Sequence, residues 1–351
     1  SVNAEPADGT PEPNYFETIR FEENHSFAAS LEGTQVEDRW LWKYAGATSG
    51  NTRDTDTSFG IDALDEFTST PAMLRYSLQG YTSFVDVEPD HHVKLLVNGE
   101  ILGELYFDGH AGVNGTLSVP AGVLREGSNT FTIRVICGTS QTYDYVAVNW
   151  FEVTYPRLYH SRDEGLIFTT NNGAVEIGNI DSADISLYEI SDSSEPVRVT
   201  GFEVIDNTLK YYAAEPGRYA LTKTPEKASM KLRPPVDLGI SADYIVITHE
   251  DFTEGAELLA AEREGQGLSS MVIDVEDIHD AFGNGLPRAE SIKDFFAWTR
   301  EAYSTPLPRY ALLMGDGSLD PKGYMGGESF VPVKMVLTDS GMIASDHWMA
   351  C

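Results

Sequence analysis

Long apolar runs, cysteines and basic side chains are all scarce in this sequence. No apolar run approaches the roughly 18 residues that a membrane-spanning helix requires, so we expect no membrane span. Acidic residues outnumber basic residues 55 to 24, which gives a formal net charge of −31. This balance argues against nucleic acid as a partner, because phosphates need Lys and Arg, and against acidic membrane surfaces. It favours solubility, cation binding or a salty medium in which salt screens the self-repulsion.

The two cysteines and the first residues bear on where the protein works. Cys137 ends a run in which Phe131, Ile133 and Val135 share its face of a strand, which predicts a buried thiol rather than a disulfide. The sequence shows no signal peptide, does not begin with Met, and opens with a Pro-rich acidic stretch that indicates a flexible linker. Such a start is typical of a processed secreted chain, so we expect an extracellular or cell-surface location.

The 351 residues leave room for two or three domains, each with its own core. We expect a flexible linker over 1–14, an all-β jelly-roll sandwich over 15–157, a small β-sandwich over 158–230 and an α/β domain over 231–351. No repeat of fixed period is present, and no low-complexity tract follows the first dozen residues.

Strict alternation identifies the strands of the first sandwich. Leu74, Tyr76 and Leu78 alternate with Arg75, Ser77 and Gln79, and Val93, Leu95 and Val97 likewise fall at every second position. Asn98 and Gly99 then supply the residues that a tight hairpin turn needs at positive φ. Many short strands over roughly 140 residues favour a jelly roll.

Short apolar runs separated by turn residues predict the small sandwich. The expected strands are Leu166–Thr169, Ala174–Ile177, Ile185–Ile190, Val197–Val204, Leu209–Ala213 and Tyr219–Leu221. Residues 223–236, with three prolines, predict a connector into the α/β part.

The stretch from Ala242 to Gly317 reads as strand, helix, strand, helix, strand. The strands are expected at 242–248, 270–275 and 309–314, with a helix capped by Thr253 and another from about Ala289. Residues 277–283 are expected to be part of the crossover into that second helix. Alternating units of this kind pack as a parallel sheet, whose chemistry lies at the carboxyl ends of the strands. Those ends carry His249–Asp251, Glu276–Asp277 and Asp316–Asp320.

These segments resemble the gingipain-like family of cysteine peptidases, caspase-fold enzymes preceded by β domains. In the α/β part the resemblance rests on Ala242–Glu250, Asp277–Phe295, Arg309–Ser318 and Ala344–Trp348; upstream it rests on Asp90–Lys94 with Asn98–Gly99 and on Trp150–Arg157. It touches most of the chain, through the order and spacing of its pieces rather than through one sharp motif.

The resemblance implies the first half of a caspase-like catalytic sheet, left incomplete. In this family the nucleophilic Cys and its His lie on later strands, and their usual segments have no counterpart among these residues, so no catalytic residue is assigned. The implied function is the N-terminal portion of a secreted cysteine endopeptidase that acts on polypeptides. The chain alone is expected to be inactive without a C-terminal catalytic half, in the same precursor or as a separate chain. The alternative is a non-catalytic extracellular binding or assembly protein that uses its β domains. Cleavage specificity does not follow from the sequence.

Two groups of carboxylates are candidate calcium ligands, since calcium takes six to eight hard oxygen ligands from flexible loops. Asp316, Asp320 and Glu328 follow the third strand in a Gly-rich loop, with Asp339 and Asp346 nearby in sequence; calcium stabilisation in related peptidases favours this site. Asp54 and Asp56 are expected in an acidic loop of the sandwich. For both groups the alternative is ordinary solvation of a loop.

Three further features have a structural and a chemical interpretation. His347 and Cys351 are four residues apart, but a strand would separate them by more than 10 Å at roughly 3.3 Å per residue, which favours no catalytic role. His249 is interpreted as a cap of the following helix rather than a chemical group. Trp40, Trp42 and Tyr44 are expected on one strand face, buried in the core rather than exposed to sugars.

Overall fold

The computed structural model describes residues 2–3, 10–28, 40–163, 165–171, 173–182, 184–212, 216–223, 238, 241–318, 320, 322–324, 326–338 and 341–350. The chain divides into two units, one formed by Ser1–Asn24 and Gly33–Ser229 and the other by His25–Glu32 and Met230–Cys351. We call them the β unit and the α/β unit and describe each by itself.

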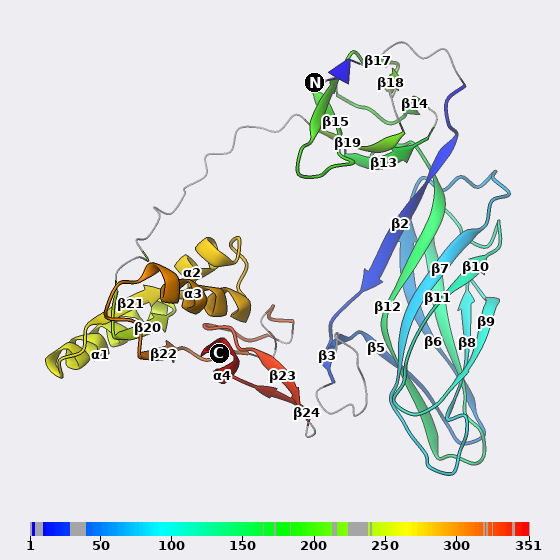
Figure 1. The fold of residues 1–351 in the computed structure, drawn as a ribbon. Coiled ribbons are helices and arrows are strands. Elements are labelled where there is room, and N and C mark those ends of the chain that lie inside the picture. The colour runs from blue at the N-terminus through cyan, green and yellow to red at the C-terminus, as the bar shows by residue number, and fades with distance from the viewer. Residues whose placement is uncertain are drawn as a thin grey trace. The chain divides into compact units, whose positions relative to one another are not determined.

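Two antiparallel sheets form the larger part of the β unit, which we call the large sandwich (Figure 1). One sheet has the order β10-β7-β12-β2, with β5 also paired to β12, and the other has the order β6-β11-β8-β9. The strands are β2 (Asn14–Glu22), β5 (Lys43–Thr48), β6 (Thr52–Ile61), β7 (Ala72–Gly80), β8 (His91–Val97), β9 (Glu100–Phe107), β10 (Gly112–Val119), β11 (Gly127–Ile136) and β12 (Tyr143–Leu158). Two short strands, β3 (Ser26–Phe27) and β4 (Trp40–Leu41), precede β5.

The alternation in the sequence becomes the core of this sandwich. Leu74, Leu78, Val93 and Leu95 are all at most 1% exposed, as expected for the inward faces of β7 and β8. Asn98 and Gly99 turn the β8–β9 hairpin with φ of 51° and 86°, which confirms the predicted turn.

The smaller part of the β unit, the small sandwich, also has two sheets. One has the order β1-β16-β15-β19-β13 and the other β14-β18-β17. The strands are β1 (Val2–Asn3), β13 (Leu166–Thr170), β14 (Ala174–Ile177), β15 (Ile185–Glu189), β16 (Val197–Thr200), β17 (Glu203–Ile205), β18 (Thr208–Tyr212) and β19 (Gly217–Lys223). The strand expected over 197–204 is therefore two strands, because the chain turns at Gly201, whose φ is 84°. The expected linker over 1–14 also needs correction, since Val2–Asn3 pairs with β16 and β2 begins at Asn14.

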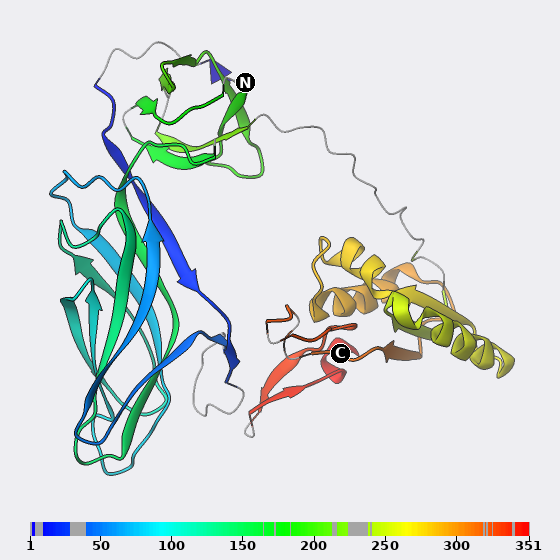
Figure 2. The same ribbon diagram turned by 180° about the vertical axis from the view of Figure 1, so that it is seen from behind.

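Strands β2 and β12 pair along the large sandwich and extend toward the small one (Figure 2). The buried Arg157 of β12 contacts residues of both sandwiches. The Arg157 side chain is 2% exposed and lies 3.0 Å from carboxylate oxygens of both Glu17 and Asp62. It also donates to the Tyr15 hydroxyl at 3.0 Å, and burial raises the pKa of Tyr15 to about 12. Tyr15 packs in the core of the small sandwich, although β12 continues through the boundary expected at 157. A buried, charge-paired arginine of this kind fixes how two packed parts meet.

The α/β unit contains a three-stranded parallel sheet of order β21-β20-β22. Its strands are β20 (Tyr244–Thr248), β21 (Ser270–Asp274) and β22 (Tyr310–Met314), so the strands holding Tyr244, Ile273 and Leu312 lie side by side as predicted. The helices are η1 (Glu250–Phe252), α1 (Thr253–Gly265), α2 (Val275–Phe282), α3 (Ala289–Ala302) and α4 (His347–Ala350). A hairpin of β23 (Met335–Thr338) and β24 (Gly341–Ala344) precedes α4.

Helices cover both faces of this sheet. Ile245 and Ile247 pack in one core with Ile292 and Phe295 of α3, while Val246 points to the other face, where Ala256 of α1 is buried. Figure 2 shows α1 apart from the pair α2 and α3. Burial on both faces is why β20 reads as a continuous apolar run.

Three sequence expectations for this unit need correction. Thr253 begins α1 but does not cap it with its side chain; its hydroxyl instead donates to the Glu250 carbonyl oxygen at 3.0 Å. Residues 275–282 form the helix α2, capped by Asp274, whereas the sequence predicted only a crossover over 277–283. His347 lies in α4 rather than in a strand approach, and Cys351 lies outside the described residues.

Candidate functional site

The carboxyl edge of the parallel sheet gathers the polar residues that the sequence placed at strand ends. Because β20, β21 and β22 are parallel and in register, Thr248, Asp274 and Met314 end side by side. The Thr248 hydroxyl donates to the Met314 carbonyl oxygen at 3.3 Å, which ties the central strand to its neighbour at this edge. His249, Glu250 and Asp251 follow directly after β20.

His249 is a capping residue, as predicted. Its Nδ1 accepts a hydrogen bond from the Asp251 amide at 3.3 Å at the start of η1. The ring also packs edge-on against Phe330, with centroids 5.2 Å apart. Asp274 has the corresponding role at α2, where its carboxylate accepts from the Glu276 amide at 3.0 Å. The edge is therefore built largely from local caps.

The loop after β22 folds back over this edge. The Asp316 carbonyl oxygen accepts hydrogen bonds from the amides of Phe330 and Val331 at 2.9 and 3.3 Å. At Gly317 a Cβ would lie 2.2 Å from a Val333 side-chain carbon, so only glycine fits between the two passes of the loop. The backbone of Asp316, rather than its side chain, thus holds the loop.

The described residues offer no activated cysteine at this edge. The free cysteine Cys137 belongs to the large sandwich, where it is 3% exposed, as predicted. Burial raises the pKa of its thiol, and its side-chain contact is with the Gln141 amide at 3.7 Å rather than with an imidazole. A thiol in this environment stays protonated and is a poor nucleophile.

The α/β unit contains one buried histidine to which no function is assigned. His279 on α2 is 1% exposed, and among the described residues neither ring nitrogen has a hydrogen-bond partner. Burial lowers the pKa of His279, so the ring is neutral at pH 7. The sequence interpretation did not single out this residue; its place in a short apolar-faced helix was the available signal.

The predicted calcium ligands of the large sandwich lie in a strand, and calcium binding there stays a prediction. Asp54 and Asp56 lie within strand β6 and not in a loop, because residues 52–61 pair along their whole length with β11. Arg134, opposite Asp54 in the register, donates to its carboxylate at 2.7 and 2.8 Å and holds the pKa of Asp54 below its usual range. Asp56 accepts from the Thr132 hydroxyl at 2.7 Å. Both carboxylates already engage protein donors.

The second predicted calcium group lies in the loop after β22. Asp320 is 4% exposed, Glu328 is exposed, and Asp339 lies outside the described residues. In the part of the chain that the structure describes, no group of three or more His, Cys, Asp or Glu side chains is placed to hold a metal ion. Calcium binding through Asp316, Asp320 and Glu328 stays a prediction.

Trp42 and Tyr44, which were expected on one buried strand face, lie in different surroundings. Trp42 packs in the core, with its ring stacked 5.8 Å from Phe151, which confirms its predicted burial. Tyr44 instead contacts Tyr81 and lies away from that core. Trp42 lies between β4 and β5 and belongs to neither strand. The strand alternation that would place the rings of Trp42 and Tyr44 on one face is therefore broken.

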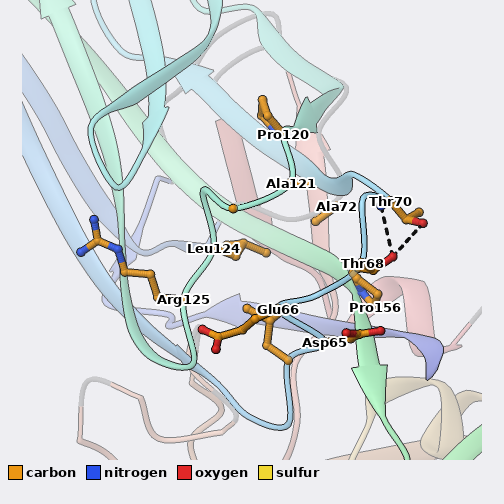
Figure 3. A pocket seen from close by; sticks show the side chains of 12 residues that line it. Asp65, Glu66, Thr68, Thr70, Ala72, Pro120, Ala121, Leu124, Arg125 and Pro156 are labelled. Carbon is orange, nitrogen blue, oxygen red and sulfur yellow. Dashed lines mark hydrogen bonds between the residues drawn. The ribbon is translucent and has the colours of Figure 1, made fainter. Parts of the chain in front are cut away.

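A cavity of about 270 Å³ opens at the 62–71 end of the large sandwich (Figure 3). Leu64, Ala72, Pro120, Leu124 and Pro156 form its apolar wall, and Asp65, Glu66, Thr68, Thr70 and Arg125 add polar groups. Asp65 accepts from the Asn14 side chain at 2.6 Å, and Thr68 and Thr70 bond each other, so these polar groups already have partners. The cavity holds no nucleophile and base in contact.

None of the described helices has the length and apolar character needed to cross a membrane.

Comparison with known proteins supports the family resemblance. Residues 238–351 match the model of Peptidase family C25, which confirms the similarity to gingipain-like cysteine peptidases over the α/β part. No curated protein matches the chain.

One solved structure is similar along the whole chain. The crystal structure of dimeric latent PorU from Porphyromonas gingivalis aligns with a TM-score of 0.67 at 15% identity, covering 99% of this chain. This chain covers 35% of the length of that protein. At this identity the likeness shows the β-rich, multidomain fold alone.

Two further matches are remote. The CBM36-1 domain of a multidomain xylanase from the hindgut metagenome of Trinervitermes trinervoides aligns at 11% identity and TM-score 0.23, covering 39% of this chain and 95% of that domain. An FMN-binding β-glucuronidase from Facaelibacterium prausnitzii L2-6 aligns at 12% identity and TM-score 0.23, covering 61% of this chain and 34% of that enzyme. Scores this low support no inference.

Proposed function

We propose that this chain is the N-terminal portion of a secreted gingipain-like cysteine endopeptidase. In this proposal residues 231–351 are the first half of a caspase-like catalytic domain, and the two sandwiches precede it. The observation that carries the proposal is the parallel sheet β21-β20-β22 with helices on both faces, inside the segment that matches Peptidase family C25. The extracellular location rests on the family resemblance.

The outer edge of β22 supports a sheet that continues. Among the described residues β22 pairs only with β20, and Tyr310 at its start is 53% exposed. Unpaired strand edges accept a further strand, and the strands of parallel sheets are normally buried on both faces. We place the next strand, contributed by a C-terminal catalytic half, along β22.

A cavity of about 360 Å³ lies beside this edge. Phe296 of α3, Leu307, Pro308 and Tyr310 form much of its lining. Leu307 is 48% exposed, so apolar surface faces solvent next to unpaired backbone. A strand added to β22 with its covering helix would bury this surface.

The chemistry of the complete enzyme then comes from the other half. A cysteine thiolate would attack the peptide carbonyl to form a thioester, and an imidazolium would protonate the leaving amine. The described residues of this chain supply the central strands and the capped loops at their carboxyl edge. Cys137 is excluded as the nucleophile by its burial and raised pKa.

Two measurements test the proposal. The isolated chain with reductant should not hydrolyse fluorescent casein; hydrolysis that iodoacetamide blocks and that Cys137→Ser leaves intact would contradict the assignment. Co-expression with the polypeptide encoded downstream should give a stable complex. Leu307→Lys should weaken that complex, because it places a charge in the apolar surface beside β22.

Leu286→Lys is the matched control, since Leu286 is 59% exposed in the turn between α2 and α3 and does not line the cavity. Equal weakening of the complex by both variants would argue against assembly along β22.

The second candidate function is an extracellular binding or assembly protein that uses its β domains. The observation in its favour is a set of exposed tyrosines at one end of the large sandwich. This surface is compatible with either function.

A further inference from the structure

Five aromatic side chains gather at one end of the large sandwich, and we call them the aromatic end: Tyr44, Tyr81, Phe84, Tyr143 and Tyr145. Ring centroids lie 4.8 Å apart for Tyr44 and Tyr81, 5.5 Å for Phe84 and Tyr143, and 5.8 Å for Tyr143 and Tyr145. The Tyr81 amide donates to the Tyr145 carbonyl oxygen at 3.0 Å, which joins the two halves of the group. The rings therefore form one surface from segments far apart in the sequence.

The strands beneath fix this surface. Gly46 lies opposite Tyr145 on β5, and a Cβ at Gly46 would lie 2.3 Å from the Tyr145 ring, so glycine makes room for the tyrosine. Between the two tyrosines of β12, Asp144 points inward and bonds His91 at 2.6 Å, with both side chains fully buried. The Tyr145 amide donates to the Thr82 hydroxyl at 3.1 Å and holds the adjoining loop.

Three tyrosines of the aromatic end are exposed to solvent, although the strands beneath them are held by hydrogen bonds and close packing. Tyr81, Tyr143 and Tyr145 are 42%, 43% and 39% exposed, and Val85 in the neighbouring loop is fully exposed. Tyrosines anchored in this way are characteristic of protein interfaces, where a rigid ring supplies contact area and a hydroxyl supplies a hydrogen bond.

The charge around the aromatic end indicates the kind of partner. The five rings come from three segments, 44–52, 79–90 and 137–148, and none of them contains Lys or Arg. Asp86 and Glu88 are exposed and follow Phe84 closely in the sequence. Aromatic faces attract ammonium and guanidinium groups, and carboxylates pair with them.

Ring geometry disfavours a sugar as the partner. The interplanar angles within the group are 68°, 66° and 58°, whereas a sugar ring would stack on a flat platform of rings. Tilted rings leave faces and edges open to a side chain that inserts between them.

We propose that the aromatic end is a docking surface for a polypeptide segment that carries Lys or Arg. The tyrosine rings hold the cationic heads and their aliphatic stems, and Asp86 and Glu88 pair with the charges. This role goes beyond the proposed peptidase function and does not depend on it.

Fluorescence anisotropy with the full chain tests the proposal. The probe is a fluorescein-labelled peptide of alternating Gly and Lys, compared with the same peptide acetylated on every Lys and with a neutral β-glucan oligosaccharide. The Lys peptide should bind, more weakly as salt rises, and the other two should not. Tyr143→Ser with Tyr145→Ser should raise its Kd about tenfold, and Asp86→Asn with Glu88→Gln should raise it severalfold.

Two matched controls separate the site from the general negative charge. Phe67→Ser removes an exposed aromatic at the opposite end of the same sandwich, and Glu254→Gln with Glu257→Gln removes two exposed charges on α1. Neither control should change the Kd. Equal losses in the controls and the test variants, binding of the acetylated peptide, or preference for the glucan would overturn the proposal. Because Asp86 and Glu88 are exposed, their variant remains informative if the tyrosine variant fails to fold.

Discussion

The two units bury one histidine each in opposite ways. In the large sandwich His91 is 0% exposed, and its Nδ1 lies 2.6 Å from the Asp144 carboxylate while its Nε2 lies 2.9 Å from the Gly109 carbonyl oxygen. In the α/β unit His279 is 1% exposed, and its ring nitrogens have no hydrogen-bond partner among the described residues. With equal burial, the pKa values of the two rings are nevertheless shifted in opposite directions.

The Asp144 carboxylate explains why the pKa shifts of His91 and His279 have opposite signs. Burial alone would lower the pKa of His91, but the hydrogen bond and charge of Asp144 outweigh it, so the pKa of His91 is raised. At His279 burial acts with the charge of Arg288 to lower the pKa, against weaker opposing effects of Asp280 and Asp274. A carboxylate partner thus raises the pKa of a buried histidine, and burial without such a partner lowers it.

Removing Asp144, the partner of His91, should have the largest effect on the free energy of unfolding. Asp144→Ala leaves the His91 imidazole buried without its counter-charge and should lower the free energy of unfolding of the large sandwich by about 3–5 kcal/mol. Urea unfolding followed by pulse proteolysis, with sandwich fragments identified by mass spectrometry, measures this loss. Asp86→Ala, at an exposed carboxylate of the same sandwich, should change the midpoint little. A small effect of Asp144→Ala would show that the pair contributes nothing to stability.

Removing the His279 imidazole should instead raise the free energy of unfolding. His279→Phe replaces the imidazole with an apolar ring that has no unsatisfied nitrogens and should stabilise the α/β unit by about 1–3 kcal/mol at pH 7. The same urea series, read on fragments of this unit, measures the gain. His347→Phe is the control because His347 is exposed, and it should leave the midpoint unchanged. Destabilisation by His279→Phe would indicate that the imidazole has a partner or a shape requirement.

The pH dependence of the two units should differ in sign. The raised pKa of His91 contributes stability that is fully present below about pH 6.5 and is lost as pH rises through the folded-state value. The lowered pKa of His279 contributes stability that is present above about pH 6.5 and is lost as pH falls through its folded-state value. Each group changes the free energy of unfolding by at most about 1.4 kcal/mol per pH unit within its window.

Urea midpoints of each unit between about pH 5 and 8 check these signs. Asp144→Asn should remove the His91 contribution and His279→Phe the His279 contribution, each in its own unit. If His91 and His279 make the urea midpoints of their units change in the same direction with pH, the proposed contrast between the two histidines is wrong.

The smallest effect concerns the open edge of the parallel sheet. Amides of β22 should exchange hydrogen several-fold faster than those of β20, because β20 is paired on both sides and β22, within the described residues, on one. Peptide-resolved hydrogen exchange measures this difference. Similar protection of both strands in the isolated chain would show that β22 is already covered.

Local patterns predicted the elements correctly where one physical cause dominates. Leu74, Tyr76 and Leu78 alternate with polar residues because these three lie on the buried face of β7, and Ile245 to Ile247 run together because both faces of β20 are buried. Two errors arose where context overrides the pattern. Asp54 and Asp56 resembled a loop, but pairing with β11 holds them in a strand, and α2 is stabilised by packing against α3 rather than by its own length.

The sequence alone determined the order of the elements and the parallel α/β part, because hydrophobic periodicity is written in neighbouring residues. Only the tertiary structure decided which charged groups are neutralised. Asp54 meets Arg134 from 80 residues away and His91 meets Asp144 from 53 away, so no local pattern records either pair. The aromatic end is likewise assembled from three separate segments, and its exposure depends on how the strands beneath it are registered.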